Sequence, residues 1–317
     1  MGKVILRRLL QSIPVFIGIT IISFALIHAV PGGPTARLEL DADIRPEDIA
    51  RIRANMGLDK PVWQQYLIWV GGLLRGDLGI SYIDQRPVAT QIRERLPKTI
   101  LLTGVALLLS IGLALPIGVM AAVKQYSWFD NITTVFSTAG ISLPSFWLGL
   151  MCILIFAVRL HWFPSGGVTT IGQPFSVPDL LKHLVMPAFV LATISIAGWS
   201  RYIRGSMLEV IRQDYVRTAR AKGLRERLVI VRHALRNALI PVATLMGLSI
   251  PNLVGGALIT ETIFSWPGIG RLAWHATTKR DYPIIMGVVV MATAMVIFGN
   301  LAADVAYGIL DPRITTE

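Results

Sequence analysis

The side chains that could do chemistry in this sequence are concentrated in one basic segment, residues 201–236. The segment holds ten Lys and Arg residues against three acidic residues, which gives a net charge of +7. The ten are Arg201, Arg204, Arg212, Arg217, Arg220, Lys222, Arg225, Arg227, Arg232 and Arg236. Guanidinium groups bind carboxylates, phosphates and anionic lipid headgroups, so this composition suits binding rather than bond chemistry.

Three interpretations of the basic segment compete. Its arginines can contact lipid headgroups and fix the topology, they can bind nucleic acid, or the segment can dock into a cytosolic partner. Nucleic-acid binding is disfavoured because the segment is short, tethered at both ends and poor in stacking aromatics. Docking is supported by two apolar stripes at helical spacing with Gly223 between them, which predict a helix-turn-helix. The stripes comprise Leu208, Ile211, Tyr215 and Ala219, then Leu224, Leu228, Val231 and Leu235.

The sequence lacks the residue patterns of zinc sites, of disulfides and of nucleotide-binding loops. The histidines show neither the i, i+4 spacing of a helical zinc site nor a His-Glu-x-x-His motif. Cys152 is the single cysteine, so an internal disulfide and a multi-cysteine metal cluster are excluded. No Gly-x-x-x-x-Gly-Lys-Ser/Thr phosphate loop occurs in the sequence. We therefore expect a protein that is not an enzyme and has no metal or cofactor of its own.

The elements that position the basic segment follow from a membrane-protein composition. Of the 317 residues, 53% are hydrophobic and 15% are charged, whereas soluble domains are about 25% charged. A membrane-spanning helix needs about 20 apolar residues, and six stretches without Asp, Glu, Lys or Arg approach or exceed this length. They cover residues 9–30, 100–123, 131–158, 184–200, 237–260 and 282–303. The sequence therefore predicts an all-α membrane protein with six transmembrane helices.

The distribution of Lys and Arg predicts that both termini lie in the cytosol, because cytosolic loops carry the excess of basic residues. With the N-terminus inside, the inner segments hold fifteen basic residues and the two short outer loops hold five. The predicted order is an N-terminus with the first helix over 1–30, an extracytoplasmic segment over 31–99, a five-helix core over 100–310 and a cytosolic tail over 311–317. The extracytoplasmic segment should be helical over 46–56 and 62–74. It either forms a cap, which docks an outside partner or shields the pore mouth, or is a packed connector.

Several short motifs occur in order along nearly the whole chain. The run Arg217-Thr-Ala-Arg-Ala-Lys-Gly223 is followed by Leu239-Ile-Pro241. The other motifs are Gly57-Leu-Asp-Lys-Pro61, Gly76-Asp-Leu-Gly79, Glu261-Thr-Ile-Phe-Ser-Trp-Pro-Gly-Ile-Gly270 and Leu310-Asp-Pro-Arg313. Together they resemble the permeases of ATP-binding-cassette importers, in the dipeptide, oligopeptide and nickel branch. The first run resembles the cytosolic coupling loop of that family, with Arg217, Thr218 and Ala219 where the general form has Glu-Ala-Ala.

The resemblance implies a non-catalytic permease subunit of an ATP-driven importer for dipeptides, oligopeptides or a related solute, in a prokaryotic plasma or inner membrane. Its partners would be a second homologous permease in a heterodimer, two cytosolic ATPases that bind ATP and Mg, and an extracytoplasmic solute-binding protein. The residues that contact the ATPases would be Arg217, Thr218, Ala219, Arg220, Ala221, Lys222 and Gly223. Nickel-chelate and glutathione importers share the pattern and stay open as alternatives. An autonomous channel or secondary transporter is a further alternative, although we see neither midplane charges nor an internal repeat.

Co-purification distinguishes an importer subunit from an autonomous transporter. We predict a stable complex with a cytosolic ATPase, which is lost when Ala219 or Gly223 is replaced by a bulky residue. The measurement is affinity purification of the tagged full chain from detergent-solubilised membranes. Transport by the purified chain alone, without ATP, would contradict the importer hypothesis.

Overall fold

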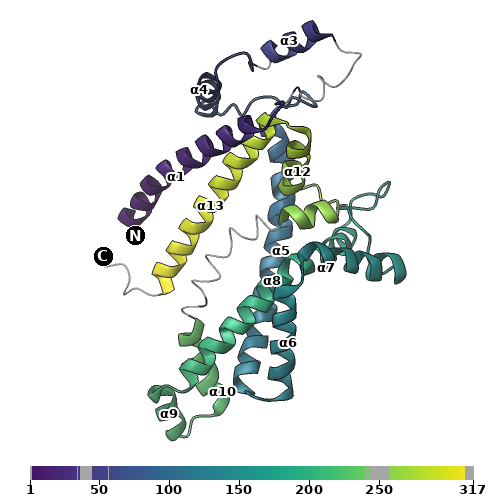
Figure 1. The fold of residues 1–317 in the computed structure, drawn as a ribbon. Coiled ribbons are helices and arrows are strands. Elements are labelled where there is room, and N and C mark those ends of the chain that lie inside the picture. The colour runs from purple at the N-terminus through teal and green to yellow at the C-terminus, as the bar shows by residue number, and fades with distance from the viewer. Residues whose placement is uncertain are drawn as a thin grey trace. The chain divides into compact units, whose positions relative to one another are not determined.

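A computed structural model describes residues 2–33, 35, 45–55, 57–239, 242 and 257–310, and these are helical apart from turns and one isolated bridge (Figure 1). The chain forms two compact units. The N-terminal unit comprises Gly2–Thr99 and Pro267–Ile297, and the central unit comprises Met1, Ile100–Trp266 and Phe298–Glu317. Two long helices, α5 (Val88–Val123) and α13 (Tyr282–Leu310), contribute to both units.

Four of the described helices are long and apolar enough to cross a membrane. They are Leu6–Ala29 within α1 (Gly2–Ala29), α5, α8 (Val177–Ile211) and Tyr282–Leu301 within α13. A fifth crossing is added if α6 (Trp128–Ser142) and the helix after it count as one bent span. The all-helical membrane fold is thus confirmed with four or five spans. The sixth predicted span, 237–260, falls mostly on residues that lie outside the described part of the chain.

The prediction of one continuous helix over residues 131–158 is wrong. Leu143 and Pro144 are extended, and the helices on either side of them meet at 105°. Proline has no N–H to donate, and it disfavours helical geometry in the residue before it. A new helix, α7 (Ser145–Cys152), therefore starts in another direction and continues into the π-helical segment η1 (Ile153–Arg159).

The basic segment begins inside a membrane-length helix. Because α8 continues to Ile211, residues 201–211 extend that helix instead of starting a separate one. Three short elements follow, namely α9 (Asp214–Ala221), α10 (Glu226–Leu228) and the π-helical segment η2 (Val229–Leu235). The helix-turn-helix predicted over 201–236 is therefore shorter, and its turn lies between α9 and α10.

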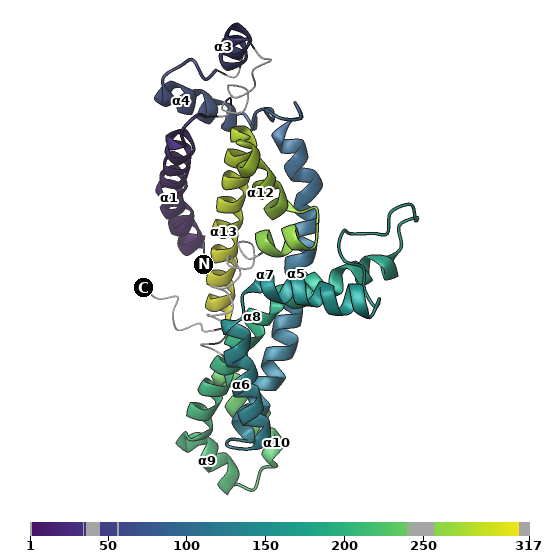
Figure 2. The same cartoon turned by 45° about the vertical axis from the view of Figure 1, so that its right-hand side comes forward.

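In the central unit, small residues let α5 and α6 approach α8 closely (Figure 2). A Cβ atom on Gly118 of α5 would lie 2.6 Å from the backbone oxygen of Ser200 and 2.8 Å from the Cβ of Ile203. On α6, a Cβ atom on Gly140 would lie 3.0 Å from the Cβ of Ala197. Lipid supplies no hydrophobic drive between helices, so membrane helices associate through close backbone packing of this kind.

The N-terminal unit has its own core, where α5, α12 (Ile269–Lys279) and α13 meet. The buried residues of this core are Val88, Ile92, Ile269, Leu272, Ala276, Ile284 and Val288. Asp281, which is 2% exposed, accepts hydrogen bonds from the Ser81 hydroxyl and the Tyr82 N–H and so fixes the turn before α5. The same unit contains α3 (Pro46–Asn55) and α4 (Val62–Leu73), which confirm the two helices predicted over 46–56 and 62–74.

Gly118→Ala is expected to destabilise the protein by about 1–3 kcal/mol, the usual cost of overpacking, because the added methyl group meets α8 backbone. Gly112→Ala in the same helix is the matched control, since a Cβ there meets nothing within 4 Å, and alanine favours helix over glycine. The measurement is the thermal unfolding midpoint of each purified variant in detergent. Equal midpoints for the two variants would contradict the close approach of α5 and α8.

Candidate functional site

The seven residues singled out by the sequence, 217–223, form the second half of α9 and the turn that closes it. The Lys222 N–H donates to the Thr218 carbonyl oxygen at 3.1 Å, and the Gly223 N–H donates to that of Arg220 at 2.9 Å. Gly223 has a φ of +75°, which residues with a Cβ adopt only with strain. A Cβ at this position would meet nothing within 4 Å. The turn therefore requires glycine for its backbone conformation and not for space.

One face of α9 is buried and the other is open. Val216 and Ala219 are buried against Val229 of η2, and Val210 of α8 packs beside them. The other motif residues are exposed, namely Arg217, Thr218, Arg220, Ala221, Lys222 and Gly223. Ala219 thus holds α9 in place, whereas the side chains of its neighbours in the motif are open to solvent.

The two apolar stripes predicted in the basic segment are only partly correct. The first is interrupted because α8 ends before α9 begins. In the second, Leu224, Leu228 and Val231 are exposed and Leu235 is half-buried against the core of the central unit, while Val229 and Ala234 are buried. Since a π-helix has more residues per turn than an α-helix, a spacing of 3.6 residues misses the buried positions Val229 and Ala234 of η2, which are five residues apart. The three exposed apolar side chains follow the basic motif closely in the chain, all within eight residues of Gly223.

An exposed ion pair joins α9 to α10 across the turn. The Arg220 guanidinium donates to the Glu226 carboxylate, with Nη2 2.7 Å from Oε1 and Nε 3.2 Å from Oε2. These hydrogen bonds lower the pKa of the Glu226 carboxyl and raise that of Arg220. Because exposed pairs of this kind stabilise a fold only weakly, the pair orients the turn while its charges stay accessible.

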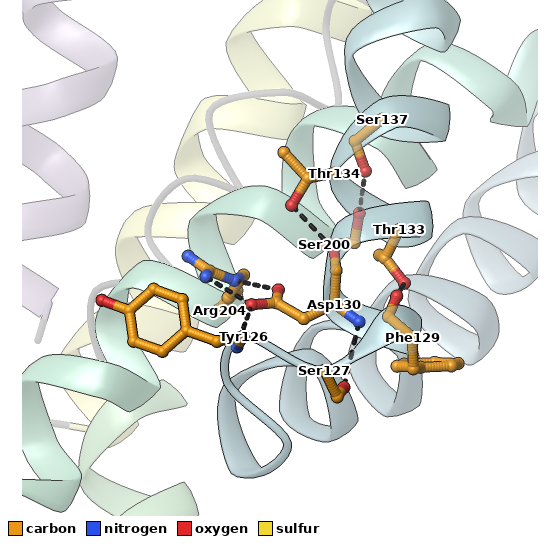
Figure 3. Close-up of polar contacts among 9 residues, drawn as sticks. All are labelled: Tyr126, Ser127, Phe129, Asp130, Thr133, Thr134, Ser137, Ser200 and Arg204. Carbon is orange, nitrogen blue, oxygen red and sulfur yellow. Dashed lines mark hydrogen bonds and ion pairs between the residues drawn. The ribbon is translucent and has the colours of Figure 1, made fainter.

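In the same unit, Arg204 of α8 and Asp130 of α6 form a bidentate ion pair (Figure 3). The Arg204 Nε lies 2.5 Å from Oδ1 of the carboxylate, and Nη2 lies 2.7 Å from Oδ2. The backbone N–H of Tyr126, in the turn before α6, donates to Oδ2 at 2.9 Å. The Asp130 side chain is 2% exposed and that of Arg204 is 27% exposed. Because a planar guanidinium matches a carboxylate at two points, the pair fixes both the distance and the angle between the helices.

Two further polar contacts secure α6 near this ion pair (Figure 3). The Ser127 hydroxyl caps the helix by accepting a hydrogen bond from the Asp130 N–H at 3.4 Å. The hydroxyl oxygens of Ser137 on α6 and Ser200 on α8 lie 3.1 Å apart, and both side chains are buried. Helix α6 is therefore tied to α8 at two levels, by the ion pair at its start and by a neutral hydrogen bond about two turns further along.

No sequence pattern pairs Asp130 with Arg204, since 74 residues separate them. One signal was nevertheless present, because Asp130 is the only acidic residue between Glu94 and Asp179. A lone carboxylate at the start of an apolar stretch needs a partner, which the basic segment can supply. Only the fold identifies which of its basic residues does so.

Known proteins resemble this chain over nearly its full length. Residues 1–103 match the family described as the N-terminal part of the membrane component of binding-protein-dependent transport systems. Residues 114–316 match the family described as the binding-protein-dependent transport system inner membrane component. The chain is 45% identical to the oligopeptide transport system permease protein AppB of Bacillus subtilis (strain 168). It is 42% identical to the dipeptide transport system permease protein DppB of Escherichia coli (strain K12), and each alignment covers 99% of both chains.

A solved structure shares the fold. A chain of the MetNI methionine ABC transporter in an inward-facing conformation matches with a TM-score of 0.55, over 70% of this chain and 97% of that chain. The two sequences are 16% identical, so this likeness concerns the fold alone.

Removing one member of the Asp130 and Arg204 pair is expected to destabilise the protein more than removing both. Arg204→Ala leaves a buried carboxylate uncompensated, at a cost of about 3–5 kcal/mol, whereas replacing both charged residues by apolar ones of similar volume, Asp130→Leu with Arg204→Met, is often close to neutral. Thermal unfolding of the purified single and double variants tests this. Arg217→Ala is the control, because the Arg217 pair with Asp214 is exposed and its loss should leave the midpoint unchanged. A double variant no more stable than Arg204→Ala would show that the two charges are not coupled.

Proposed function

The chain belongs to the family of binding-protein-dependent transport system inner membrane components, and on this premise we propose that it is a permease subunit of an ATP-driven importer for dipeptides or oligopeptides. The observation that carries the substrate class is the near full-length similarity to permease proteins of oligopeptide and dipeptide transport systems. As a non-catalytic membrane component, the chain forms half of the translocation pathway. The energy comes from ATP that partner subunits bind and hydrolyse.

The proposed assembly contains a second homologous permease in a heterodimer, two cytosolic ATPases and an extracytoplasmic solute-binding protein. The chain lies in the membrane with six spans and both termini in the cytosol. One observation supports this orientation within the central unit. The basic elements α9 and α10 lie at the same end of the unit as the turn before α6, which carries Lys124 (Figures 1 and 2). The charge count assigns both segments to the cytosol.

We assign the ATPase contact to residues 217–223 of α9 and the turn after it. The exposed cations Arg217 and Lys222 give this contact its charge, and the apolar side chains of Leu224, Leu228 and Val231 lie next to it. Interfaces combine an apolar centre with a charged rim, which this composition matches. The buried side of α9 is occupied by its own chain, so a partner meets only the exposed side.

Movement of the docked ATPases is transmitted through rigid contacts in the central unit. Ala219 and Val216 pack against η2 and the end of α8, so α9 cannot shift without them. The ion pair between Arg204 and Asp130 then carries the displacement of α8 into the start of α6. Because this link is bidentate and its carboxylate is buried, it resists rotation as well as separation. A displacement of α9 therefore reaches two membrane helices together, which is what alternating access requires.

Substitutions at Gly223 test this coupling in proteoliposomes that contain the assembled transporter and the solute-binding protein. Gly223→Val should uncouple ATP hydrolysis from peptide uptake, because a β-branched residue at positive φ is strained by about 1–3 kcal/mol. Gly223→Asn is the matched control, since asparagine adopts this conformation with less strain than other residues that have a Cβ, and it should keep uptake closer to normal than Gly223→Val does. The readouts are labelled dipeptide taken up and phosphate released.

The outcomes separate the mechanism from the substrate. Normal uptake by Gly223→Val would refute the assignment of the coupling turn. Transport of another solute that depends on ATP, with no uptake of dipeptides or oligopeptides by the unaltered protein, would refute the peptide substrate and leave the coupling turn intact.

A further inference from the structure

Helix α4 carries an exposed apolar face that the proposed coupling mechanism does not use. We propose that this face lies in the interface of the lipid bilayer, on lipid, and anchors the extracytoplasmic segment to the membrane surface. The assignment of α4 to the outer leaflet rests on the proposed orientation, whereas the contact with lipid does not.

The composition of α4 separates it from its neighbour α3. From Val62 to Leu74 the chain contains no charged residue, whereas the ten residues of α3 include Glu47, Asp48, Arg51 and Arg53. With 12 residues, α4 is about 18 Å long, which is too short for the roughly 30 Å of a hydrocarbon core. A helix that is apolar but too short to span is either buried in protein or lies in the membrane interface.

One face of α4 packs on α1 through aromatic and polar contacts. The rings of Tyr66 and Trp69 lie 5.3 Å and 6.2 Å from that of Phe24, centroid to centroid. The Tyr66 hydroxyl lies 3.1 Å from that of Thr20. His28 Nε2 lies 3.0 Å from the side-chain oxygen of Gln65. The two helices are therefore joined by one row of contacts.

The position of these contacts along α1 sets the depth of α4. Thr20, Phe24 and His28 are spaced four residues apart, so they lie on one face of the last turns of α1. The apolar span of α1 ends at Ala29, and Thr20 lies nine residues before it, or about 13 Å along the helix. The row of contacts thus runs from the end of the span toward the membrane interior. Both views show α4 beside the end of α1 that is far from the N-terminus (Figures 1 and 2).

The other face of α4 is large and apolar. Trp63 is 62% exposed, Leu67 58% and Ile68 57%. The membrane span of α1 is also exposed on the side away from α4, where Ile22 and Leu26 are 60% and 64% exposed. Tryptophan and tyrosine favour the boundary between headgroups and acyl chains, where a ring can be apolar on one side and polar on the other. An uncharged, exposed face on a helix that packs against the last turns of a membrane span matches lipid and not water.

Spin-label accessibility in the assembled transporter tests the proposal in lipid nanodiscs. In a Cys152→Ala background the chain has no cysteine, so a single nitroxide can be attached to Leu67→Cys. Arg51→Cys on α3 is the aqueous control, and Leu108→Cys on α5, where the native side chain is 70% exposed within a span, is the lipid control. We expect the ratio of collisions with oxygen to collisions with a water-soluble nickel chelate to be several-fold higher at Leu67 than at Arg51. Trp63→Cys, on the same face, should give the same result.

Two other outcomes would overturn the lipid contact. Nickel accessibility at Leu67 equal to that at Arg51 would show that the face is in water. Protection from both reagents would show that another protein subunit covers it. None of these measurements requires ATP or a transported solute, so failure of the proposed peptide import would leave the result interpretable.

Discussion

The buried carboxylate of Asp130 is the constraint on which the central unit depends. A carboxylate that is 2% exposed has little contact with water, so it stays ionised at low cost only if it is paired. Arg204 supplies both hydrogen bonds of a guanidinium fork, and the Tyr126 N–H supplies a third. These three donors come from α8 and from the turn before α6, so satisfying one charge sets where α6 starts and how it lies against α8.

Close packing and a helix break also restrict how the helices around this pair can be arranged. Gly118 leaves no space for a methyl group between α5 and α8, and Gly140 leaves little between α6 and α8. Pro144 ends α6 by disrupting its backbone hydrogen bonding. The N-terminal unit also contains a buried carboxylate, Asp281, which accepts hydrogen bonds from the Ser81 hydroxyl and the Tyr82 N–H. In each unit a buried carboxylate pins a turn at the start of a helix.

The two exposed surfaces differ in composition, and each composition matches the environment that we propose for that surface. The side chains next to Gly223 combine cations with an apolar patch, as a protein interface does. The outer face of α4 has no charge at all, and α4 lies level with the end of a membrane span. In the two proposals the same apolar chemistry serves a protein contact in one place and a lipid contact in the other, and the neighbouring charges distinguish the two.

The sequence by itself determined the helical membrane class, the position of most spans and the residues of the turn at Gly223. These features depend on local hydropathy, local charge and short motifs, all of which can be identified from residues that are close together in the sequence. The tertiary structure decided the break at Pro144, the buried face of η2 and the pairing of Asp130 with Arg204. A proline can kink a helix or end it depending on its neighbours, and a π-helix changes the residues that share a face. The partner of a buried charge is chosen by proximity in space, and a separation of 74 residues hides that proximity from the sequence.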